Sequence, residues 1–428
     1  MSILMLQATR DTLLADAAKC DSRSLFFDRF ADPAAKEDER NAWFKKAIAR
    51  KPSLAKLGAW NAWLGSAGLK SEEILFAKLQ ARLMVNMAGG VMENAGICLD
   101  RFGAPYIPGT AVKGCARRMA IQNLLEARET QEPSDRLARL LADIALVFGW
   151  GEQEWSEKKK DGKFISDFAF AVGVDRWREV SSQARSRLSE ANHFGGMVSF
   201  LPAFPYQLPA PDLELDIVTG HHQAYYADNH MPVALDTEDP NPVMFPAAAA
   251  NIIFQFVVLP LPFGSHRDSF SQPGAKLHGL AFEWLRQGSE TFGLGAKTAA
   301  GYGWFDASET FNTEFARQLG KQAGAAAEQA AKDRRRSSLT PDDAWLAQFK
   351  SFPEARRREV INKFAFDDER WWPIQGELAD ERIQFSLLHF LLKIEPDFLA
   401  ADRASSKSKT TKALAGLRRK FPPLAGTK

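Results

Sequence analysis

The sequence predicts an α+β protein whose core runs strand, helix, strands, strand, helix and final strand. Apolar residues recur at helical spacing in residues 110–127 and 275–288, so each segment is predicted as an amphipathic core helix. Apolar residues alternate or run continuously in residues 75–86, 213–219 and 252–259, which is typical of strands. This order predicts a ferredoxin-like, RNA-recognition-motif-like βαββαβ core with large insertions and helical N- and C-terminal extensions.

Three parts of the chain differ in pattern. Residues 1–75 are predicted as a helical N-terminal extension, residues 76–308 as the core with its insertions, and residues 309–428 as a basic helical C-terminal extension. From residue 310 onward the chain holds 22 Lys and Arg against 16 Asp and Glu. Such a basic extension either contacts nucleic acid or is merely solvated, and the charge balance leaves both open.

The elements before the first core helix have local signals. In the N-terminal extension, Trp60 and Trp63 lie three positions apart, and we expect this apolar face to dock on the core. The strand predicted at 75–86 places five apolar side chains on one face, namely Ala77, Leu79, Ala81, Leu83 and Val85. The glycine pair at 89–90 is expected to end it.

Composition limits the class of protein. The 428 residues are 45% hydrophobic and carry a net charge of only +2, as in an ordinary globular chain. The three cysteines, Cys20, Cys98 and Cys115, are far apart, so neither a zinc ribbon nor a disulfide framework is predicted. The N-terminus lacks a signal-peptide pattern, and no apolar run reaches the roughly 18 residues that span a membrane. We therefore expect a cytoplasmic protein.

The first informative motif introduces the first core helix, in residues 103–118. Pro105 and Pro108 hold an extended entry, and Thr110 is the predicted N-cap. Lys113 and Arg117 then share one helix face, and Arg118 lies on the adjacent face. Cations in the first turns of a helix oppose its macrodipole, and a bound anion would compensate. These three side chains are predicted phosphate contacts, against the alternative of solvated side chains.

The second informative motif is a loop with four glycines in residues 292–305. It is not a Walker A loop, because Ala296 precedes Lys297, and it is not a dinucleotide fingerprint, because it connects a helix to a strand. A loop of this kind suits close approach of a phosphodiester backbone, although a tight turn without ligand has the same composition. The predicted RNA-binding residues are Gly293, Gly295, Lys297, Thr298, Gly301, Tyr302 and Gly303, with Lys297 on the phosphate.

A histidine-containing loop in residues 220–230 allows a catalytic alternative. His221 or His222, with Tyr225, could act as general acid or base in metal-independent RNA cleavage. A zinc site formed with His230 is disfavoured, since no two ligands have helical spacing and no cysteine is near. We favour loop histidines with structural hydrogen bonds, of which His222 is also a candidate RNA contact.

These motifs together resemble a known family. The segment from Pro105 to Gly109, followed by Lys113-Gly114 and Arg117, is similar to the "PYIPGSSLKG-xx-R" motif of the RAMP superfamily of CRISPR-associated proteins. The glycines of the 292–305 loop are similar to the C-terminal glycine-rich loop of that superfamily. The block 215–226 and the segment 239–243 narrow the resemblance to the family of the sixth subunit of the Cmr complex, the type III-B effector. The resemblance covers about residues 77–306.

The resemblance implies a non-catalytic, RNA-binding subunit without a cofactor. It implies a position at the end of the filament of backbone subunits, near the 3′ region of the CRISPR RNA, in antiviral defence. The implied partners are the CRISPR RNA, the target RNA and the other Cmr subunits (backbone, small helical and terminal RAMP subunits), with no membrane. Some RAMP relatives cleave RNA with a histidine, so the resemblance leaves the ribonuclease alternative open. A third alternative is a structural adaptor whose basic residues meet acidic proteins.

Overall fold

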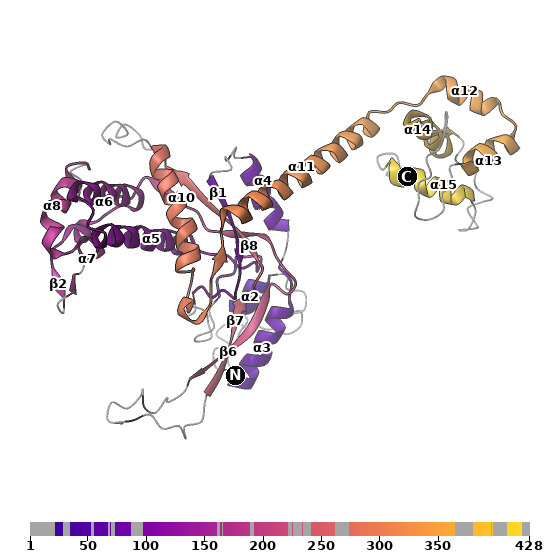
Figure 1. The fold of residues 1–428 in the computed structure, drawn as a ribbon. Helices are drawn as coiled ribbons and strands as arrows, with labels where there is room; N and C mark the ends of the chain where they lie inside the picture. The colour runs from indigo at the N-terminus through magenta and orange to yellow at the C-terminus, as the bar shows by residue number, and fades with distance from the viewer. Residues whose placement is uncertain are drawn as a thin grey trace. The chain divides into compact units, whose positions relative to one another are not determined.

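A computed structural model of the chain describes residues 22–28, 35–52, 55–66, 69, 73–86, 97–160, 163–164, 166–188, 192–220, 225, 233, 241–261, 274–363, 380–394, 396 and 409–421. The chain divides into two compact units, residues 1–315 and residues 316–428 (Figure 1). The first unit mixes helices with antiparallel sheets, which confirms the α+β class.

The first unit is built on one antiparallel sheet with the strand order β4–β8–β1–β9, in which β5 also pairs with β8. Its strands are β1 (Ile74–Leu79), β4 (Val198–Phe200), β5 (Phe204–Gln207), β8 (Ile253–Pro260) and β9 (Phe305–Asp306). Strands β1 and β8 form its centre, with Leu75 opposite Phe256 and Ala77 opposite Phe254. These side chains are buried because alternate residues of a strand point to the same face.

Two helices, α5 (Gly109–Glu129) and α10 (Gly274–Thr291), pack against each other and against the sheet (Figure 1). The α5 stripe predicted from the sequence is buried, as are Leu277, Trp284 and Leu285 of α10. The two helices approach closely at Gly288, where a Cβ would lie 2.9 Å from the carbonyl oxygen of Cys115. A glycine at this crossing lets the backbones meet, which fixes the start of α5 beside the end of α10.

Helix α4 (Ala55–Ser66) and the start of α11 (Glu309–Ser337) pack on the other face of the sheet. Phe76, Gln255 and Phe204 occupy one row of paired residues across β1, β8 and β5. From α4, Trp60 packs on Phe204, and Asn61 accepts a hydrogen bond from Gln255 at 2.5 Å. The predicted docking of the Trp60 face on the core is therefore observed, and this part of the sheet face is covered by the protein's own helices.

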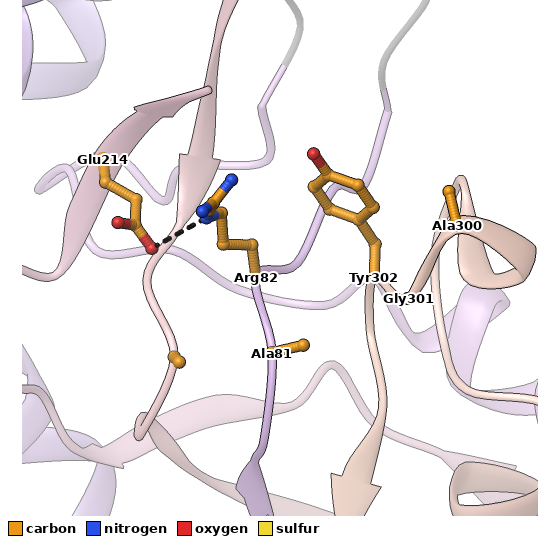
Figure 2. Close-up of a pocket in the computed structure, with 7 residues that line it drawn as sticks. Ala81, Arg82, Glu214, Ala300, Gly301 and Tyr302 are labelled. Carbon is orange, nitrogen blue, oxygen red and sulfur yellow. Dashed lines mark ion pairs between the residues drawn. The ribbon is translucent and has the colours of Figure 1, made fainter. Parts of the chain in front are cut away.

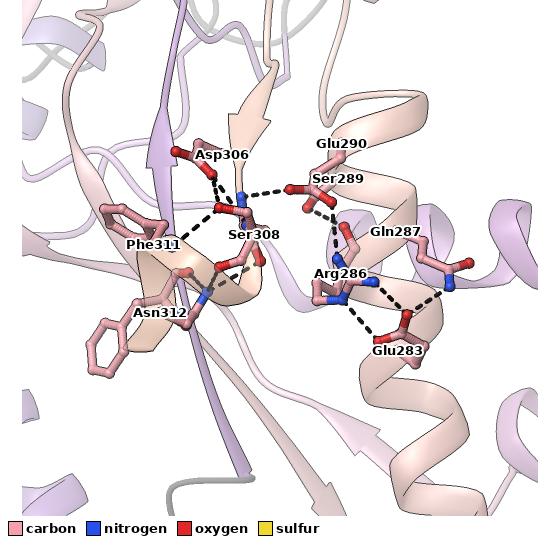
Figure 3. A network of polar contacts seen from close by, with 11 residues as sticks. Glu283, Arg286, Gln287, Ser289, Glu290, Asp306, Ser308, Phe311 and Asn312 are labelled. Atoms are coloured by element: carbon pink, nitrogen blue, oxygen red, sulfur yellow. Dashed lines mark hydrogen bonds and ion pairs between the residues drawn. The ribbon is translucent and has the colours of Figure 1, made fainter. Parts of the chain in front are cut away.

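The start of α11 completes the edge of the sheet at β1. Strand β9 pairs only with Lys78 and Leu79, so Phe76 lies beyond its reach. The side-chain amide of Asn312 replaces the missing strand: it accepts a hydrogen bond from the Phe76 N–H at 3.0 Å and donates one to the Phe76 carbonyl at 2.9 Å. Figure 3 shows Asn312 in this place, beside a network in which Glu290 of α10 accepts a bond from the backbone N–H of Ala307.

A separate hairpin of β6 (Leu213–Gly220) and β7 (Asn241–Ala248) extends from the core (Figure 1). Its base is tied to the end of β1 by a bridge between Leu83 and Ala248. Helix α3 (Glu37–Ala49) packs on the hairpin, and α2 (Arg23–Asp28) packs on α3. From α2, the fully buried Arg23 reaches Asp212 at the base of β6, with an Nη2–Oδ2 distance of 2.5 Å.

The insertion after α5 is mostly helical in the residues that the structure describes. Its elements are α6 (Ser134–Phe148), η3 (Glu152–Trp155), β2 (Lys159–Lys160), β3 (Lys163–Phe164), α7 (Asp167–Val172) and α8 (Val174–Arg185). Helices α6 and α7 both pack against α5. This insertion places α7 next to the basic residues of the first core helix.

The second unit has a core of its own. It continues α11 and adds α12 (Asp343–Ser351), α13 (Glu354–Lys363), α14 (Glu381–His389), η7 (Phe390–Ile394) and α15 (Lys409–Lys420). Its buried cluster includes Phe349, Ile361, Phe390 and Leu417.

Two local predictions are wrong. Thr110 is not the N-cap of α5: the helix begins one residue earlier, at Gly109, after Pro108, and no side chain caps it. The carbonyl oxygen of Pro108 accepts the first hydrogen bonds of the helix, from the N–H groups of Ala111 and Val112 at 2.9 and 3.1 Å, so the helix begins before Thr110. The strand predicted for 75–86 ends at Leu79, because β9 is short and the chain then turns to bridge β7.

Candidate functional site

The start of α5 carries the three predicted basic contacts, and each side chain has a different environment. Lys113 is half-buried; burial lowers its pKa from the ordinary value, and the nearby charge of Arg117 lowers it further. An anion beside Lys113 would reverse both effects, because it stabilises the ammonium form. Phosphate contact at Lys113 stays a prediction.

Arg117 already has an anionic partner inside the protein. Its guanidinium makes a two-pronged ion pair with the carboxylate of Asp167 at the start of α7; the Nη2–Oδ1 distance is 3.0 Å. Bidentate pairs of this kind use the charge and the donors of the arginine together. The structure thus leaves Arg117 less suited to phosphate than the sequence predicts, because the insertion supplies its counter-ion.

Arg118 brings the two glycine motifs together. Its guanidinium carbon lies 4.1 Å from the centroid of the Phe292 ring, the residue that precedes the first glycine of the loop. One turn away, the Cys115 thiol lies 3.7 Å from the carbonyl oxygen of Gly293. An aromatic ring attracts a cation without cancelling its charge, so Arg118 keeps a full positive charge next to the loop.

The glycines of the 292–305 loop are required by packing within the protein. Gly293, Gly295, Gly301 and Gly303 all have positive φ angles, between 67° and 91°. A Cβ on Gly303 would overlap the carbonyl oxygen of Leu294, whereas a Cβ on Gly301 would meet nothing within 4 Å. Gly303 therefore permits a close backbone crossing, and Gly301 permits a turn on an open surface.

Many backbone N–H groups of this loop donate hydrogen bonds within the protein and are therefore not free for a phosphodiester backbone. The Ala296 N–H donates to the carbonyl of Met84, the Gly303 N–H to that of Arg82, and the Leu294 N–H to that of Gly303, all at 2.7–2.8 Å. Further N–H groups, those of Ala300, Gly301 and Tyr302, donate within the loop. The loop is thus a rigid support for its side chains, fixed on the chain that follows β1.

Lys297 and Thr298 lie at the turn of this loop. Lys297 adopts the left-handed conformation, with φ 59° and ψ 29°, and its ammonium lies 5.2 Å from the centroid of the Phe245 ring on β7. The Thr298 carbonyl accepts a hydrogen bond from the Trp304 indole at 2.9 Å. As with Arg118, the charge of Lys297 is held in place and remains uncompensated by the ring.

Tyr302 lies in a polar group with Asp216, Arg82 and Glu214, none of which is a predicted site residue. Its hydroxyl donates a hydrogen bond to Asp216 of β6, and the same carboxylate pairs with Arg82. Glu214, two residues earlier on β6, lies 3.3 Å from Nε of Arg82. The carboxylates are two positions apart on one strand, so alternation puts both on the same face, but nothing local in the sequence connects them with Arg82 or Tyr302.

These contacts shift the pKa values of the group. Burial tends to raise the pKa of Asp216, but hydrogen bonds from Tyr302, from the Ile217 N–H and from Arg82 together hold it below its ordinary value. Burial raises the pKa of Tyr302, and its bond to Asp216 raises it further. Around neutral pH the group therefore consists of a carboxylate, a neutral phenol and a guanidinium.

A cavity of about 420 Å³ opens beside this group (Figure 2). Figure 2 shows Arg82 between Glu214 and Tyr302, with the turn at Ala300 and Gly301 forming the next part of the wall. The glycine loop therefore forms one wall of this cavity, and the other walls come from the residues after β1 and from the base of the β6–β7 hairpin.

The remaining predictions concern the loop histidines, a metal site and a membrane-spanning helix. His221, His222 and His230 lie outside the described residues. Within the described part of the chain, no group of three or more His, Cys, Asp or Glu is placed to hold a metal ion. Among the helices that the structure describes, none has both the length and the apolar character needed to cross a bilayer.

The fold and these contacts define an α+β protein in which a glycine loop, following a core helix, is fixed on the first core strand and a neighbouring hairpin. No family model matches the chain. The chain is similar to the CRISPR system Cmr subunit Cmr6 of Pyrococcus furiosus, with 28% identity over 235 residues, 53% of this chain. The chain spans 65% of the length of that relative. This match confirms the resemblance to the sixth Cmr subunit that the motifs indicate.

Two solved structures are similar at lower levels. A chain in a cryo-EM structure of the type III-B Cmr-beta bound to cognate target RNA has a TM-score of 0.35 and 15% identity, covering 71% of this chain and 86% of its own. The crystal structure of Cmr6 from Pyrococcus furiosus has a TM-score of 0.29 and 21% identity, covering 55% of this chain and 97% of its own.

Proposed function

We propose that this chain is a non-catalytic RNA-binding subunit of a type III-B CRISPR ribonucleoprotein. It caps the backbone filament near the 3′ region of the CRISPR RNA and helps to hold the guide–target duplex. Its partners are the CRISPR RNA, the target RNA and other Cmr subunits. The observation that carries this proposal is the sequence similarity to Cmr6 over 235 residues.

The topology of the first unit supports a ferredoxin-like core. Two strand–helix–strand units, β1–α5–β4 and β8–α10–β9, interleave in the sheet order β4–β8–β1–β9. Every pairing is antiparallel, and the two helices pack together against the sheet. This is the arrangement expected of a βαββαβ fold with insertions between its elements.

The charges at the site favour three phosphate contacts. Arg118 and Lys297 lie against aromatic rings and keep their charge. Lys113 is half-buried and makes no ion pair with a carboxylate among the described residues. Arg117 is a weaker candidate because Asp167 neutralises it. The loop glycines, Thr298 and Tyr302 provide the rigid backbone around Lys297, and His222 remains a candidate contact.

Salt-dependent RNA binding tests the proposal. The complex is reconstituted with the chain carrying Lys113→Ala, Arg118→Ala and Lys297→Ala together, and its affinity for labelled guide RNA is measured across a salt series. Each lost phosphate contact lowers the logarithmic salt slope by about 0.7 on single-stranded RNA. We expect weaker binding and a slope lower by about 2. Unchanged affinity and slope in a correctly folded variant would reject RNA contact at this site.

Two controls sharpen this test. Arg117→Gln removes one positive charge at the same helix face, and we expect only a small change in slope because that charge is paired. Incubation of the isolated chain with RNA in EDTA examines the ribonuclease alternative. Cleavage that disappears in His222→Ala would overturn the non-catalytic assignment.

A further inference from the structure

The cavity beside the glycine loop has walls from four segments that are separate in the sequence, one of which is Ala250 after β7. Ala81 and Arg82 follow β1, Glu214 lies on β6, and Ala300, Gly301 and Tyr302 belong to the loop. Its volume of about 420 Å³ falls within the range of about 300–1,000 Å³ that is usual for small-molecule sites. It is therefore large enough for a nucleobase and part of its sugar.

The charges around the cavity argue against a phosphate inside it. Arg82 is the cation among the lining residues, and it is paired with Asp216 as well as Glu214. Among the lining residues, Glu214 balances the charge of Arg82, and Asp216 pairs with the same guanidinium from outside the lining. The wall therefore has no unpaired cation for a phosphate, and a neutral group with N–H donors suits it better.

The cavity wall carries a hydrogen-bond acceptor and an aromatic ring, the two groups that can bind a nucleobase. The Glu214 side chain is 37% exposed, and a carboxylate accepts hydrogen bonds from the amino group of a base. The Tyr302 hydroxyl is fixed by Asp216, which holds the ring at the edge of the cavity, and aromatic rings stack with bases. At Gly301 a Cβ would meet nothing within 4 Å, so this part of the wall is open to a ligand.

The geometry points to a pocket for an unpaired nucleobase that carries an exocyclic amino group. The base stacks on Tyr302 and donates its amino hydrogen to Glu214, while Lys297 of the loop and Arg118 of α5, which lies against Phe292, are available for the phosphates. Cytosine, adenine and guanine carry an exocyclic amino group that can donate to Glu214. Uracil lacks that group, and its N3–H lies between two carbonyl oxygens that the carboxylate repels, so uracil is disfavoured. This inference rests on the proposed RNA-binding function and adds a base preference to it.

Base preference can be measured with homopolymers. The full chain is titrated into fluorescein-labelled oligocytidylate and oligouridylate of about 12 nucleotides at one salt concentration. We expect oligocytidylate to bind about tenfold more tightly, as a hydrogen bond to a charged acceptor allows. Glu214→Gln should bring the ratio close to one, because a carboxamide both donates and accepts. Tyr302→Leu should weaken binding of both oligonucleotides, and Tyr302→Phe should retain the stacking.

The matched control is Glu129→Gln. It removes the same charge at the exposed end of α5, outside the cavity, and should leave the tenfold ratio unchanged. If the wild-type chain binds neither oligonucleotide, the proposed RNA-binding function fails, and the pocket with it. If it binds both equally and Glu214→Gln changes nothing, RNA binding stands and the base pocket is rejected. If Glu214→Gln instead weakens assembly with other subunits at an unchanged ratio, the cavity holds a basic protein side chain and the base pocket is likewise rejected.

Discussion

At the scale of single residues, the buried pair of Arg23 and Asp212 joins the N-terminal helices to the core. Arg23 is fully buried and also donates to the backbone carbonyls of Gly103 and Arg50, the latter at 3.1 Å. Removing one partner of such a pair leaves an uncompensated charge in the interior, which typically costs about 3–5 kcal/mol. We therefore expect Arg23→Ala to lower the free energy of unfolding by about 4 kcal/mol, measured by urea denaturation.

A double variant separates the charge effect from packing. Arg23→Met combined with Asp212→Leu removes both charges and fills similar volume, so it should be less destabilising than the sum of its two single changes. The Gly103 carbonyl still loses its donor in the double variant, so full recovery is not expected. Additive losses would show that the ion pair contributes nothing beyond its separate contacts.

The lowered pKa of Asp216 predicts that the stability of the folded chain depends on pH. Its pKa is held below the ordinary value in the folded chain, so its contribution to stability is fully present above the unfolded pKa of about 3.9 and is lost as pH falls through the folded value. Asp216→Asn should therefore lower the melting temperature at pH 7 by about 2 °C. The difference should shrink as the pH falls below about 4. A loss of the same size at pH 7 and in acid would contradict the assigned role of the carboxylate.

The residues of the site were predicted from the sequence only where the signal is local. Lys113, Arg117 and the loop glycines stand out by spacing and composition. The ion pair of Arg117 could not be predicted, since Asp167 lies 50 positions later on an insertion helix without a clear pattern. The contacts of Tyr302 with Asp216 and Arg82 likewise depend on tertiary structure, and together they change which side chains are suited to bind phosphate.

At the scale of elements, two glycines of the loop share a backbone conformation but should differ in how much an alanine destabilises the protein. Gly301 and Gly303 both have positive φ, but only Gly303 faces a neighbouring carbonyl. Gly301→Ala should cost about 1 kcal/mol of unfolding free energy, the usual penalty for this conformation. Gly303→Ala adds a collision with the Leu294 carbonyl and should cost about 3 kcal/mol or more. Equal losses in chemical denaturation would mean that the loop shifts to relieve the contact.

The same scale shows why some elements were predicted and others were not. Helices α5 and α10 and strands β6 and β8 each have a strong pattern of their own, and the structure contains all four. Strand β7 was not predicted as a strand, because Pro242 and Pro246 remove backbone donors within it. A two-stranded hairpin tolerates both prolines, since each strand has one side without a partner strand.

At the scale of the whole molecule, the boundary predicted before residue 309 coincides with the start of α11, whereas the two compact units divide inside that helix. The structure divides the chain after Phe315, because Asn312 completes the edge of β1 and Phe315 packs against Phe76 and Tyr206. The first two turns of α11 therefore belong to the core. A compositional change marks where the sequence becomes basic, and it carries no information about which helical turns pack on a distant strand.

The two units have cores made of separate side chains, and this predicts two unfolding events in calorimetry of the full chain. Phe254 is fully buried in the first core and Phe349 almost fully in the second. Truncating either to alanine removes about 3–5 kcal/mol from the core that contains it. We expect Phe254→Ala to lower the temperature of one transition and Phe349→Ala that of the other. A single transition lowered by both variants would show that the chain unfolds as one cooperative unit.

With two transitions, guide RNA that binds through the glycine loop should raise only the transition temperature that Phe254→Ala lowers, because a ligand stabilises the unit it binds.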